Sequence, residues 1–374
     1  MNNLKGSEKR KKKIAIFHNA LDNIGGAELV DLILARELDA DIYTTNIDKE
    51  KIEKMGFSSE RIYSIGKVPI NAPLRQESIY WKFRKFKPKK EYDFYIIAGD
   101  WAMAAAIKNK PHLWYVYSPT REIWDLHKYV RNTIKDSKTR LTFDIWVFFR
   151  RIINKRDSKK VQNLIGISKT VQNRIKKYLE RESKVIYPPT ETNIYKNKSS
   201  KNYWLSVNRL IDHKRVDMQL KAFAKMPNEK MILVGSYEES EHFQNYAKYI
   251  NKIKPNNVEI KSWVSQKELI QLYSECKGFL TTSKEEDYGM TPIEAMASGK
   301  PAIAPNEGGY SETILNNKTG ILIDNINPEK IIRAIDTINN NLKKNPDYYK
   351  KACLERAKEF DTKIFIEKMK KEIN

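Results

Sequence analysis

Short apolar runs alternate with amphipathic segments along the chain. Segments with the periodicity of a helix, such as residues 27–39 and 169–180, lie between several of these runs. Alternating strands and helices are typical of βαβ units, whose strands form a parallel sheet. In the first half, strands are predicted at residues 14–20, 41–47, 92–99, 113–118, 163–168 and 184–188.

The same alternation starts again in the second half of the chain. Residues 195–202, YKNKSSKN, separate the halves; they are polar and charged and lack periodicity, which is typical of a linker. No repeat of fixed period is present, so a solenoid is not expected. The pattern predicts two doubly wound α/β domains in tandem. Strands of the second half are predicted at residues 203–209, 230–236, 258–264, 278–283, 301–305 and 319–323.

The composition agrees with two globular domains. A chain of 374 residues is long for a single core, and 40% hydrophobic residues exclude wholesale disorder. No apolar stretch approaches the ~20 residues of a membrane span, and the basic N-terminus lacks the apolar core of a signal peptide. Cys276 and Cys353 are too few for a disulfide framework or a four-ligand zinc site. A reduced, cytoplasmic protein is expected.

The net charge of +22 indicates an anionic partner or simply lysine-rich solvated helices. Nucleic acid, anionic membrane surfaces and phosphorylated substrates all fit such a charge. The chain lacks RNA-binding aromatic motifs, a zinc finger and a helix-turn-helix signature, so nucleic acid is not the expected partner.

In open parallel sheets, ligands bind at the carboxyl ends of the strands, so the loops that follow strands are the candidate sites. In the loop HNALDNIGGAE (18–28), Gly25 and Gly26 precede a helix, where backbone amides can meet an anion. The loop matches neither GxGxxG nor a P-loop, and a tight turn is the alternative.

A second loop, SVNRLIDHKRVD (206–217), places Arg209 at a predicted strand end and Lys214 five positions later. Two cations on one strand-to-helix loop suit a diphosphate, because Arg binds it in bidentate fashion and Lys adds a point charge. The alternative is a pair of solvated surface charges.

A third loop places Glu286 and Glu294 with seven positions between them. Thr291 is the predicted N-cap of the following helix, and Pro292 its first residue, which puts Glu294 on the first turn. Two carboxylates here can accept hydrogen bonds from the vicinal hydroxyls of a sugar or a ribose.

A fourth loop, APNEGGYSETI (304–314), repeats the pattern of strand, glycine pair and short helix. The amides of Gly308 and Gly309 are candidates to face a ligand, and a structural turn is the alternative.

The segment EEDYGMTPIEAMASGKPAIAPNEGGYSETI, preceded by NRLIDHKRVD, resembles the retaining glycosyltransferases of family 4. VSQKELIQLYSECKGFL and TGILID extend the resemblance, as do GGAE, YVYSPTREIWD, IGISKTVQNRI and VIYPP in the first half. It implies the GT-B fold: two Rossmann-like doubly wound domains facing across a cleft, with a C-terminal helix packing back on the N-terminal domain. The implied domains are 1–194 for the acceptor, 203–360 for the nucleotide-sugar and 361–374 for the returning helix.

The resemblance also implies residue roles. Arg209 and Lys214 would bind the donor diphosphate and stabilise the leaving group. Glu294 would accept from the ribose hydroxyls, and Glu286 would hold hydroxyls of the transferred sugar. Further donor-binding contacts are implied for Tyr288, Gly289, Met290, Gly25 and Gly26.

The chain departs from the family at Tyr117-Ser118-Pro119, where relatives often carry His-Thr-Pro or His-Ser-Pro. That histidine is the usual contact to the reacting sugar, whereas a tyrosine is a poor base at neutral pH. In retaining enzymes of this type the leaving phosphate is thought to take the acceptor proton, so no protein base is required. Tyr117, Arg121 and Asp100 are the acceptor-side candidates, although Asp100 could instead cap a helix.

The implied function is transfer of a hexose from a nucleotide-diphosphate sugar to a lipid-linked or surface glycan acceptor. The segments around Tyr117 and Lys214 are most similar to users of GDP-mannose, and UDP-sugars are the alternative. No Asp-x-Asp motif stands at a strand end, so neither a metal nor another cofactor is expected. The other hypotheses are a GT-B epimerase or polymerase, an inactive binding subunit, and a basic nucleic-acid-binding protein.

Residues 140–156 combine Trp146, Phe148, Phe149, Ile152 and Ile153 with a basic end. Such a segment could lie on a membrane, but its apolar residues occur on nearly all sides, which favours a buried helix. The basic N-terminal half, including its Lys-rich tail, still favours anionic lipid headgroups, so peripheral membrane association is predicted.

Overall fold

A computed structural model describes residues 10–23, 25–235, 241–262 and 264–374. The Lys-rich tail before residue 10 and two predicted strand positions, 236 and 263, lie outside these ranges. The chain forms two compact units. The first unit comprises Met1–Gly166, Arg174–Lys184 and Lys370–Asn374, and the second comprises Ile167–Asn173 and Val185–Met369. Residues 195–202 form no helix or strand. The boundaries of the three domains implied by the resemblance stay a prediction.

The first unit is built on a seven-stranded sheet in the order β3-β2-β1-β4-β5-β6-β7. Neighbouring strands from β3 to β6 are parallel, and β1, β4 and β5 are buried along their whole length. Strands covered on both faces are typical of doubly wound folds. The bounds are β1 (Ile14–Phe17), β2 (Asp41–Thr44), β3 (Ile62–Ser64), β4 (Phe94–Ile97), β5 (His112–Val116), β6 (Asn163–Gly166) and β7 (Lys184–Val185).

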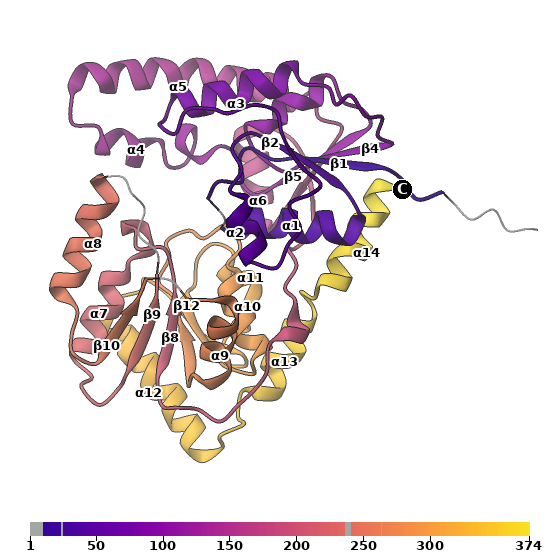
Figure 1. Ribbon diagram of the computed structural model, residues 1–374. Helices are drawn as coiled ribbons and strands as arrows, with labels where there is room; N and C mark the ends of the chain where they lie inside the picture. Colours follow the sequence, from indigo (N-terminus) through magenta and orange to yellow (C-terminus); the bar gives the residue numbers. More distant parts are fainter. Residues whose placement is uncertain (1–9, 24, 236–240, 263) are drawn as a thin grey trace, which may run out of the picture. The chain divides into compact units, whose positions relative to one another are not determined.

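Helices cover both faces of this sheet. In Figure 1, α3 and α5 lie on one side of the strands and α1 and α2 on the other. The bounds are α1 (Gly26–Leu38), α2 (Lys49–Lys54), α3 (Leu74–Lys85), α4 (His127–Thr133) and α5 (Ser137–Ser158), with short 3-10 helices η1 (Ala102–Ile107) and η2 (Arg121–Ile123). The end of the chain also belongs to this unit, where Lys12 Nζ donates to the carbonyl of Ile373 at 2.7 Å.

The second unit carries a six-stranded parallel sheet in the order β10-β9-β8-β11-β12-β13. Its strands are β8 (Trp204–Val207), β9 (Met231–Val234), β10 (Val258–Lys261), β11 (Gly278–Leu280), β12 (Ala302–Pro305) and β13 (Gly320–Ile323).

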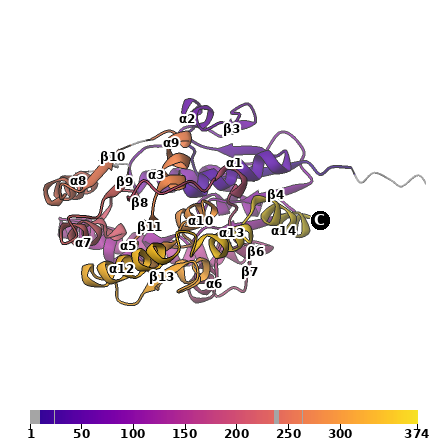
Figure 2. The ribbon, with the colours of Figure 1, turned by 90° about the horizontal axis from the view of Figure 1, so that it is seen from below.

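Helices α10 and α13 of the second unit lie side by side in both views (Figures 1 and 2). Trp204 and Phe279 are fully buried in the core. The helices of this unit are α6 (Lys169–Arg174), α7 (Val216–Ala224), α8 (Glu241–Ile253), α9 (Gln266–Glu275), α10 (Met290–Ala297), α11 (Tyr310–Thr313), α12 (Pro328–Lys344) and α13 (Lys350–Lys358), and α14 (Thr362–Ile373) ends in the first unit.

Both sheets confirm the predicted doubly wound α/β architecture. Each predicted strand is present, usually shorter than its apolar run, and β3 is an additional strand. The strand order reverses direction between β1 and β4 in the first unit and between β8 and β11 in the second. Such switch points leave a crevice at the carboxyl ends of the strands, which is where doubly wound folds bind ligands.

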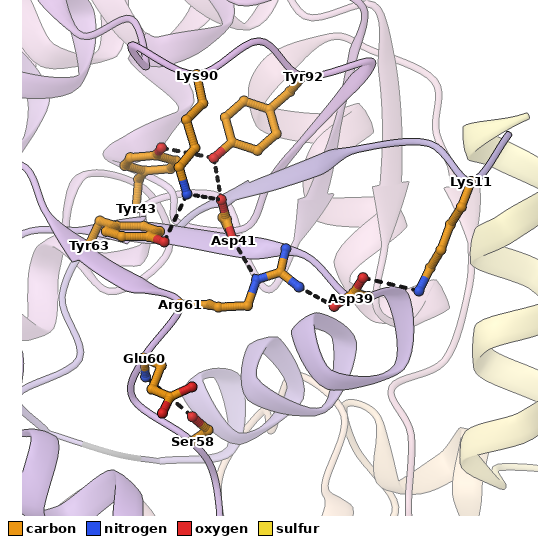
Figure 3. A network of polar contacts seen from close by, with 10 residues as sticks. All are labelled: Lys11, Asp39, Asp41, Tyr43, Ser58, Glu60, Arg61, Tyr63, Lys90 and Tyr92. Carbon is orange, nitrogen blue, oxygen red and sulfur yellow. Dashed lines mark hydrogen bonds and ion pairs between the residues drawn. The ribbon is translucent and has the colours of Figure 1, made fainter.

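A polar network closes the opposite, amino-terminal edge of the first sheet (Figure 3). Asp41, the first residue of β2, is buried and accepts hydrogen bonds from Tyr92 at 2.5 Å, Arg61 at 2.6 Å and Lys90 at 3.2 Å. Lys90 also donates to Tyr63 at 2.9 Å. These bonds join the segments that precede β3 and β4 to β2, so the network fixes the edge strand β3 without occupying the carboxyl end of the sheet.

Helix α5 corrects the expectation that residues 140–156 form a buried helix. Phe148, Phe149 and Ile152 are each more than half exposed, while Arg150 and Asp157 are buried. The pattern alone could not show which side packs, because apolar residues occur on most sides and the buried side is fixed by polar partners on α3. Within the described ranges, none of the helices has the length and apolarity that crossing a bilayer requires.

The Asp41 network yields a stability prediction. Its donors hold the pKa of Asp41 below the usual aspartate range although burial acts in the opposite direction. Stability from the ionised carboxylate is therefore present above the unfolded-state pKa and is lost as the pH falls through the lower folded-state pKa. We expect Asp41→Asn to reduce the free energy of unfolding by about 1–3 kcal/mol at pH 7, with a smaller difference below about pH 4. Urea denaturation at several pH values measures this.

The control is Asp39→Asn, because Asp39 is an exposed partner of the same Arg61. An exposed ion pair contributes less than about 1 kcal/mol, so this variant should change stability little. Equal losses for the two variants would contradict the assigned role of Asp41.

Candidate functional site

In the second unit, the structure brings together two predicted site residues from different loops. Lys214 lies in the loop after β8 and Glu286 in the loop after β11, and these strands are parallel neighbours. Lys214 Nζ lies 2.6 Å from Glu286 Oε2. The side chains are 14% and 23% exposed, so the pair is partly shielded and still open to solvent.

Glu286 is held in its ionised form. Burial acts to raise its pKa, but the Lys214 ammonium and the Ser283 hydroxyl bond the carboxylate and bring the pKa down to about 2. An ionised carboxylate is a hydrogen-bond acceptor only, which suits it to hydroxyl donors.

Arg215 is a residue of this site that the sequence reasoning missed. It has a left-handed backbone conformation, with φ of 50°, at the start of α7. Its guanidinium donates to the carbonyls of Thr282 at 2.6 Å and Ser283 at 3.2 Å and bonds Glu307. Arg215 therefore fixes the loop that leads to Glu286. The sequence signal that could have identified Arg215 is its position directly after Lys214.

Glu294 lies on α10 and is held by tyrosines. Tyr273 of α9 donates to Glu294 Oε2 at 2.6 Å, and the Tyr195 hydroxyl also bonds the carboxylate. Burial raises the pKa of Glu294 despite these bonds. The tyrosines orient the carboxylate at the edge of the unit's core.

Helix α10 begins earlier than predicted. It starts at Met290 with Gly289 as its N-cap, so Thr291 is not the cap and Glu294 lies beyond the first turn. Gly289 has φ of 82°, and a Cβ there would lie 2.4 Å from the Tyr310 ring, so this position requires glycine. Glycine has no side chain that could cap the helix, so the N-cap residue makes no side-chain hydrogen bond to the N-terminal amides of α10.

The glycine pair of the fourth loop has a structural role. The Gly309 amide donates to the carbonyl of Glu286 at 2.8 Å, so it does not face a ligand. A Cβ at Gly308 would lie 2.4 Å from the Glu286 carbonyl oxygen, and one at Gly309 would lie 2.4 Å from Tyr288 Cα. The glycines therefore let the loop after β12 pack directly on the loop that carries Glu286.

Other residues of these loops have defined positions. Tyr288 is buried and its ring stacks on Tyr187, so its side chain belongs to the core. Glu312 accepts hydrogen bonds from the amides of Lys169 at 2.7 Å and Thr170 at 2.8 Å. Its carboxylate thereby caps the N-terminus of α6. Arg209 follows β8 by two residues and has an exposed side chain.

The first unit contains a cavity of about 450 Å³ at the carboxyl ends of β1, β4 and β5. This volume lies in the range of small-molecule sites. The acceptor-side candidates Tyr117, Arg121 and Asp100 all line it. Its other polar walls include carboxylates and a second arginine: Asp22, Glu28, Glu122 and Arg75.

Tyr117 joins a buried polar chain next to this cavity. Its hydroxyl donates to Asp31 Oδ1 at 2.6 Å. His18 Nδ1 lies 2.5 Å from Asp31 Oδ2, and His18 Nε2 lies 3.3 Å from Glu28 Oε1. Burial and the Asp31 carboxylate raise the pKa of the Tyr117 phenol, so Tyr117 does not act as a base at neutral pH.

His18 is the second functional candidate that the sequence reasoning missed. Burial alone would lower its pKa, but the adjacent Asp31 and Glu28 carboxylates raise it to about 10. The imidazole is therefore positively charged at neutral pH. Two signals were present in the sequence: a histidine directly after a strand, and an aspartate, Asp31, within the apolar run of α1.

Two carboxylic acids that line the cavity also have pKa values above their ordinary range. Burial raises the pKa of Asp100, which accepts from Asn19 at 2.6 Å and from the amide of Trp101 at 2.9 Å. Burial and the neighbouring Asp100 charge raise the pKa of Glu122 to about 7. Arg121 is held by Asp125 at 2.7 Å. The cavity thus combines a group that titrates near neutrality with fixed charges of both signs.

Gly25 precedes α1 on the same side of the unit. Its amide donates a hydrogen bond to Glu28 Oε2 at 2.8 Å, so this amide is already bonded by a carboxylate of the chain itself. A donor-phosphate role for Gly25 and Gly26 stays a prediction.

Residues 189–354, all within the second unit, match the model of the family described as glycosyl transferases group 1. An uncharacterized glycosyltransferase of Haemophilus influenzae is 25% identical to this chain, and the match covers 88% of this chain and 91% of that protein. The alpha-1,3/1,6-mannosyltransferase ALG2 of Candida glabrata is 26% identical over 82% of this chain and 79% of its own. An uncharacterized glycosyltransferase of Methanocaldococcus jannaschii is 28% identical over 55% of this chain, which spans 56% of that protein.

Solved structures resemble the whole chain in fold. The Anabaena HepE protein, crystallised with UDP-glucose, has a TM-score of 0.73 at 19% identity and covers 97% of this chain and 99% of its own. Sucrose-phosphate synthase of Thermosynechococcus elongatus has a TM-score of 0.72 at 16% identity, over 96% and 98% of the two chains. These likenesses show that the chain has the fold of these structures, and residues 189–354 are similar to the glycosyl transferases group 1.

The buried His18 charge yields a prediction of pH dependence. A histidine whose pKa is raised on folding stabilises the protein fully below its unfolded-state pKa of about 6.5. That stability is lost as the pH rises through the folded-state pKa of about 10. We expect the free energy of unfolding to fall from pH 7 to pH 9.5 by up to about 1.4 kcal/mol per pH unit, and His18→Gln to abolish this slope. Urea denaturation measures it.

His127→Gln is the control, since His127 lies on the short helix α4 outside the cavity lining. The imidazole signals in NMR spectra provide a second measurement. A His18 resonance that titrates near pH 6.5 would show that the ring is not held charged.

Proposed function

We propose that the chain is a retaining glycosyltransferase that moves a hexose from a nucleotide-diphosphate sugar to a glycan acceptor. The Lys214–Glu286 pair carries the proposal. It joins a cation and an ionised carboxylate on neighbouring loops at the switch point of the second sheet, within the segment that matches the family model. A diphosphate is bound by a cation and sugar hydroxyls by a hydrogen-bond acceptor, and the pair supplies both.

In the proposed reaction, the bond between the anomeric carbon and the diphosphate oxygen breaks and a bond to the acceptor oxygen forms on the same face. The acceptor proton passes to the leaving phosphate. Lys214 has three N–H donors, so it can keep its bond to Glu286 and still donate to the phosphate. Arg209 supplies the second cation, and the two together stabilise the charge that develops on the leaving group.

The remaining donor contacts follow from α10. Glu294 would accept from the ribose hydroxyls, with its orientation set by Tyr273 and Tyr195. The amides of Tyr288, Gly289 and Met290 would line the same pocket, where the N-terminus of α10 favours negative charge. The proposed phosphate neutralisation by Arg209 and Lys214 requires no metal or other cofactor.

For the acceptor, we propose the cavity of the first unit. Its carboxylates accept hydrogen bonds from hydroxyls, which suits a sugar more than a phosphate. Asp100 and Arg121 line it, and we add Glu122, whose raised pKa lets it donate or accept a proton near neutral pH. Tyr117 would act as a hydrogen-bonding wall of this cavity and not as a base.

The proposed donor is GDP-mannose, with a UDP-sugar as the second choice. Similarity to the mannosyltransferase ALG2 supports a mannosyl donor, and the likeness to HepE in complex with UDP-glucose supports a UDP-sugar. We further propose that the acceptor is lipid-linked or part of a surface glycan, and that the protein works in the cytoplasm on an anionic membrane surface.

Substitution of the charge pair tests the site. We expect Glu286→Gln and Lys214→Ala each to lower sugar transfer, or donor hydrolysis where no acceptor is known, at least about a hundredfold. The pair Lys261 and Glu268 of the same unit is a matched control, with 2.8 Å between Nζ and Oε1. Lys261→Ala and Glu268→Gln should leave the rate unchanged, as should EDTA. Equal rates for Glu286→Gln and the wild type would refute the site, and a wild type without activity above background would favour an inactive binding subunit.

Nucleotide binding tests the donor. A ligand that binds only the folded state raises its stability, so saturating GDP should raise the melting temperature by about 5 °C and UDP by less. A larger shift with UDP would reverse the choice of donor. No shift with either nucleotide would contradict a nucleotide-sugar site.

A further inference from the structure

Helix α5 packs on the first unit with a side that carries both polar and apolar residues. Arg150, Asn154 and Asp157 are buried there together with Val147, and Trp146 stacks on Trp101. Asp157 accepts from Tyr80 at 2.6 Å and from Arg84 at 2.8 Å, both on α3. The Arg150 guanidinium bonds Glu77 of α3 and lies over the Tyr80 ring. Hydrogen bonds, ion pairs and the stacking of Trp146 on Trp101 therefore hold α5 in place.

The opposite side of α5 is apolar and exposed. Its five large side chains recur at the spacing of one helical face and are each between 50% and 62% exposed. A helix on the surface of a soluble domain normally buries such a face, and large exposed apolar patches usually mark interaction sites. We call these five residues the α5 stripe: Leu141, Ile145, Phe148, Phe149 and Ile152.

Basic residues flank the α5 stripe along the chain. Lys138 precedes it, and Arg156 and Lys159 follow it; all three are exposed. Three acidic groups nearby are paired: Asp144 with Arg131 at 2.8 Å, Glu180 with Lys155 at 2.5 Å, and the buried Asp157 with Arg156 at 3.2 Å. Asp136 caps α5 through Thr139. An apolar face flanked by positive charge complements a partner that has a negatively charged surface and an apolar interior.

Further exposed apolar side chains occur on the helix that α5 packs against. Leu74 and Trp81 of α3 are 65% and 49% exposed, and Ile70 precedes the helix with 80% exposure. A second copy of this chain would bring the same cations against one another at such a face, whereas anionic lipid headgroups would neutralise them.

We propose that the α5 stripe is a membrane-docking surface, which inserts into the headgroup region of a bilayer that contains anionic lipid. Phe148 and Phe149 enter the apolar boundary, and Lys138, Arg156 and Lys159 contact the headgroups. This inference deepens the membrane association proposed above and does not require the proposed sugar transfer. Interfacial helices bind through buried apolar area together with attraction to anionic lipids.

Vesicle flotation tests the surface. The vesicles contain phosphatidylcholine, alone or with about one third phosphatidylglycerol. We expect the wild-type chain to float with the anionic vesicles at low salt. Phe148→Ser with Phe149→Ser should weaken this binding at least about tenfold. Lys138→Gln with Arg156→Gln and Lys159→Gln should also weaken it at least about tenfold, and about 0.5 M salt should weaken the binding of the wild type.

Matched controls lie in the second unit. Leu315 and Tyr348 are also exposed, at 39% and 50%, so Leu315→Ser with Tyr348→Ser should float as the wild type does. Lys318→Gln with Lys343→Gln and Lys344→Gln removes the same number of charges elsewhere and should have a smaller effect. A direct measurement is Phe149→Trp, whose fluorescence should be quenched by brominated lipid if residue 149 enters the bilayer.

Three results would overturn the proposal. The first is a wild-type chain that does not float with anionic vesicles at low salt, and the second is a Phe148→Ser/Phe149→Ser variant that floats normally. The third is sedimentation in which this variant converts a dimer into a monomer, because a second copy would then cover the stripe. Donor hydrolysis by the stripe variants in the absence of lipid should equal that of the wild type, so loss of docking and failure of the proposed chemistry are distinguishable.

Discussion

The parallel pairing of β8 with β11 is the constraint on which the arrangement of the proposed donor site depends. Parallel neighbours end at the same edge of a sheet, so Lys214 and Glu286 meet although 72 positions separate them. The first unit repeats this geometry, where β1 pairs with β4 and Asn19 bonds Asp100 across 81 positions. In both units the sheet is a rigid frame, and the loops at its switch point supply the chemistry.

Environment gives chemically identical side chains opposite properties in this protein. Glu286 and Glu122 are both partly shielded from solvent, yet the Lys214 ammonium holds the pKa of Glu286 at about 2, whereas burial and the Asp100 charge raise that of Glu122 to about 7. The first is a permanent charge and the second can exchange a proton.

The sequence predicted most of the strands because buried parallel strands are short apolar runs between helices. It missed β3, which has three residues of which only Ile62 is buried. The start of α10 was wrong because the backbone of Gly289, with its positive φ, begins the helix before Thr291. The meeting of Lys214 and Glu286 was within reach of topology, but the His18 cluster was not, since its members look like ordinary strand-end and helix residues. Periodicity likewise could not show that α5 buries Arg150 and Asp157 and leaves Phe148 and Phe149 exposed.

The buried cluster of His18, Asp31, Glu28 and Tyr117 also limits how this protein can evolve. Exchanging His18 for a neutral residue leaves the buried Asp31 and Glu28 carboxylates without their cation, which typically costs about 3–5 kcal/mol. A domain has only about 5–15 kcal/mol of stability, so a single exchange consumes much of its margin. Tyr117 is therefore tied to Asp31 by its hydrogen bond and, through Asp31, to His18. We expect lineages to change these positions together, as a correlated set, or not at all.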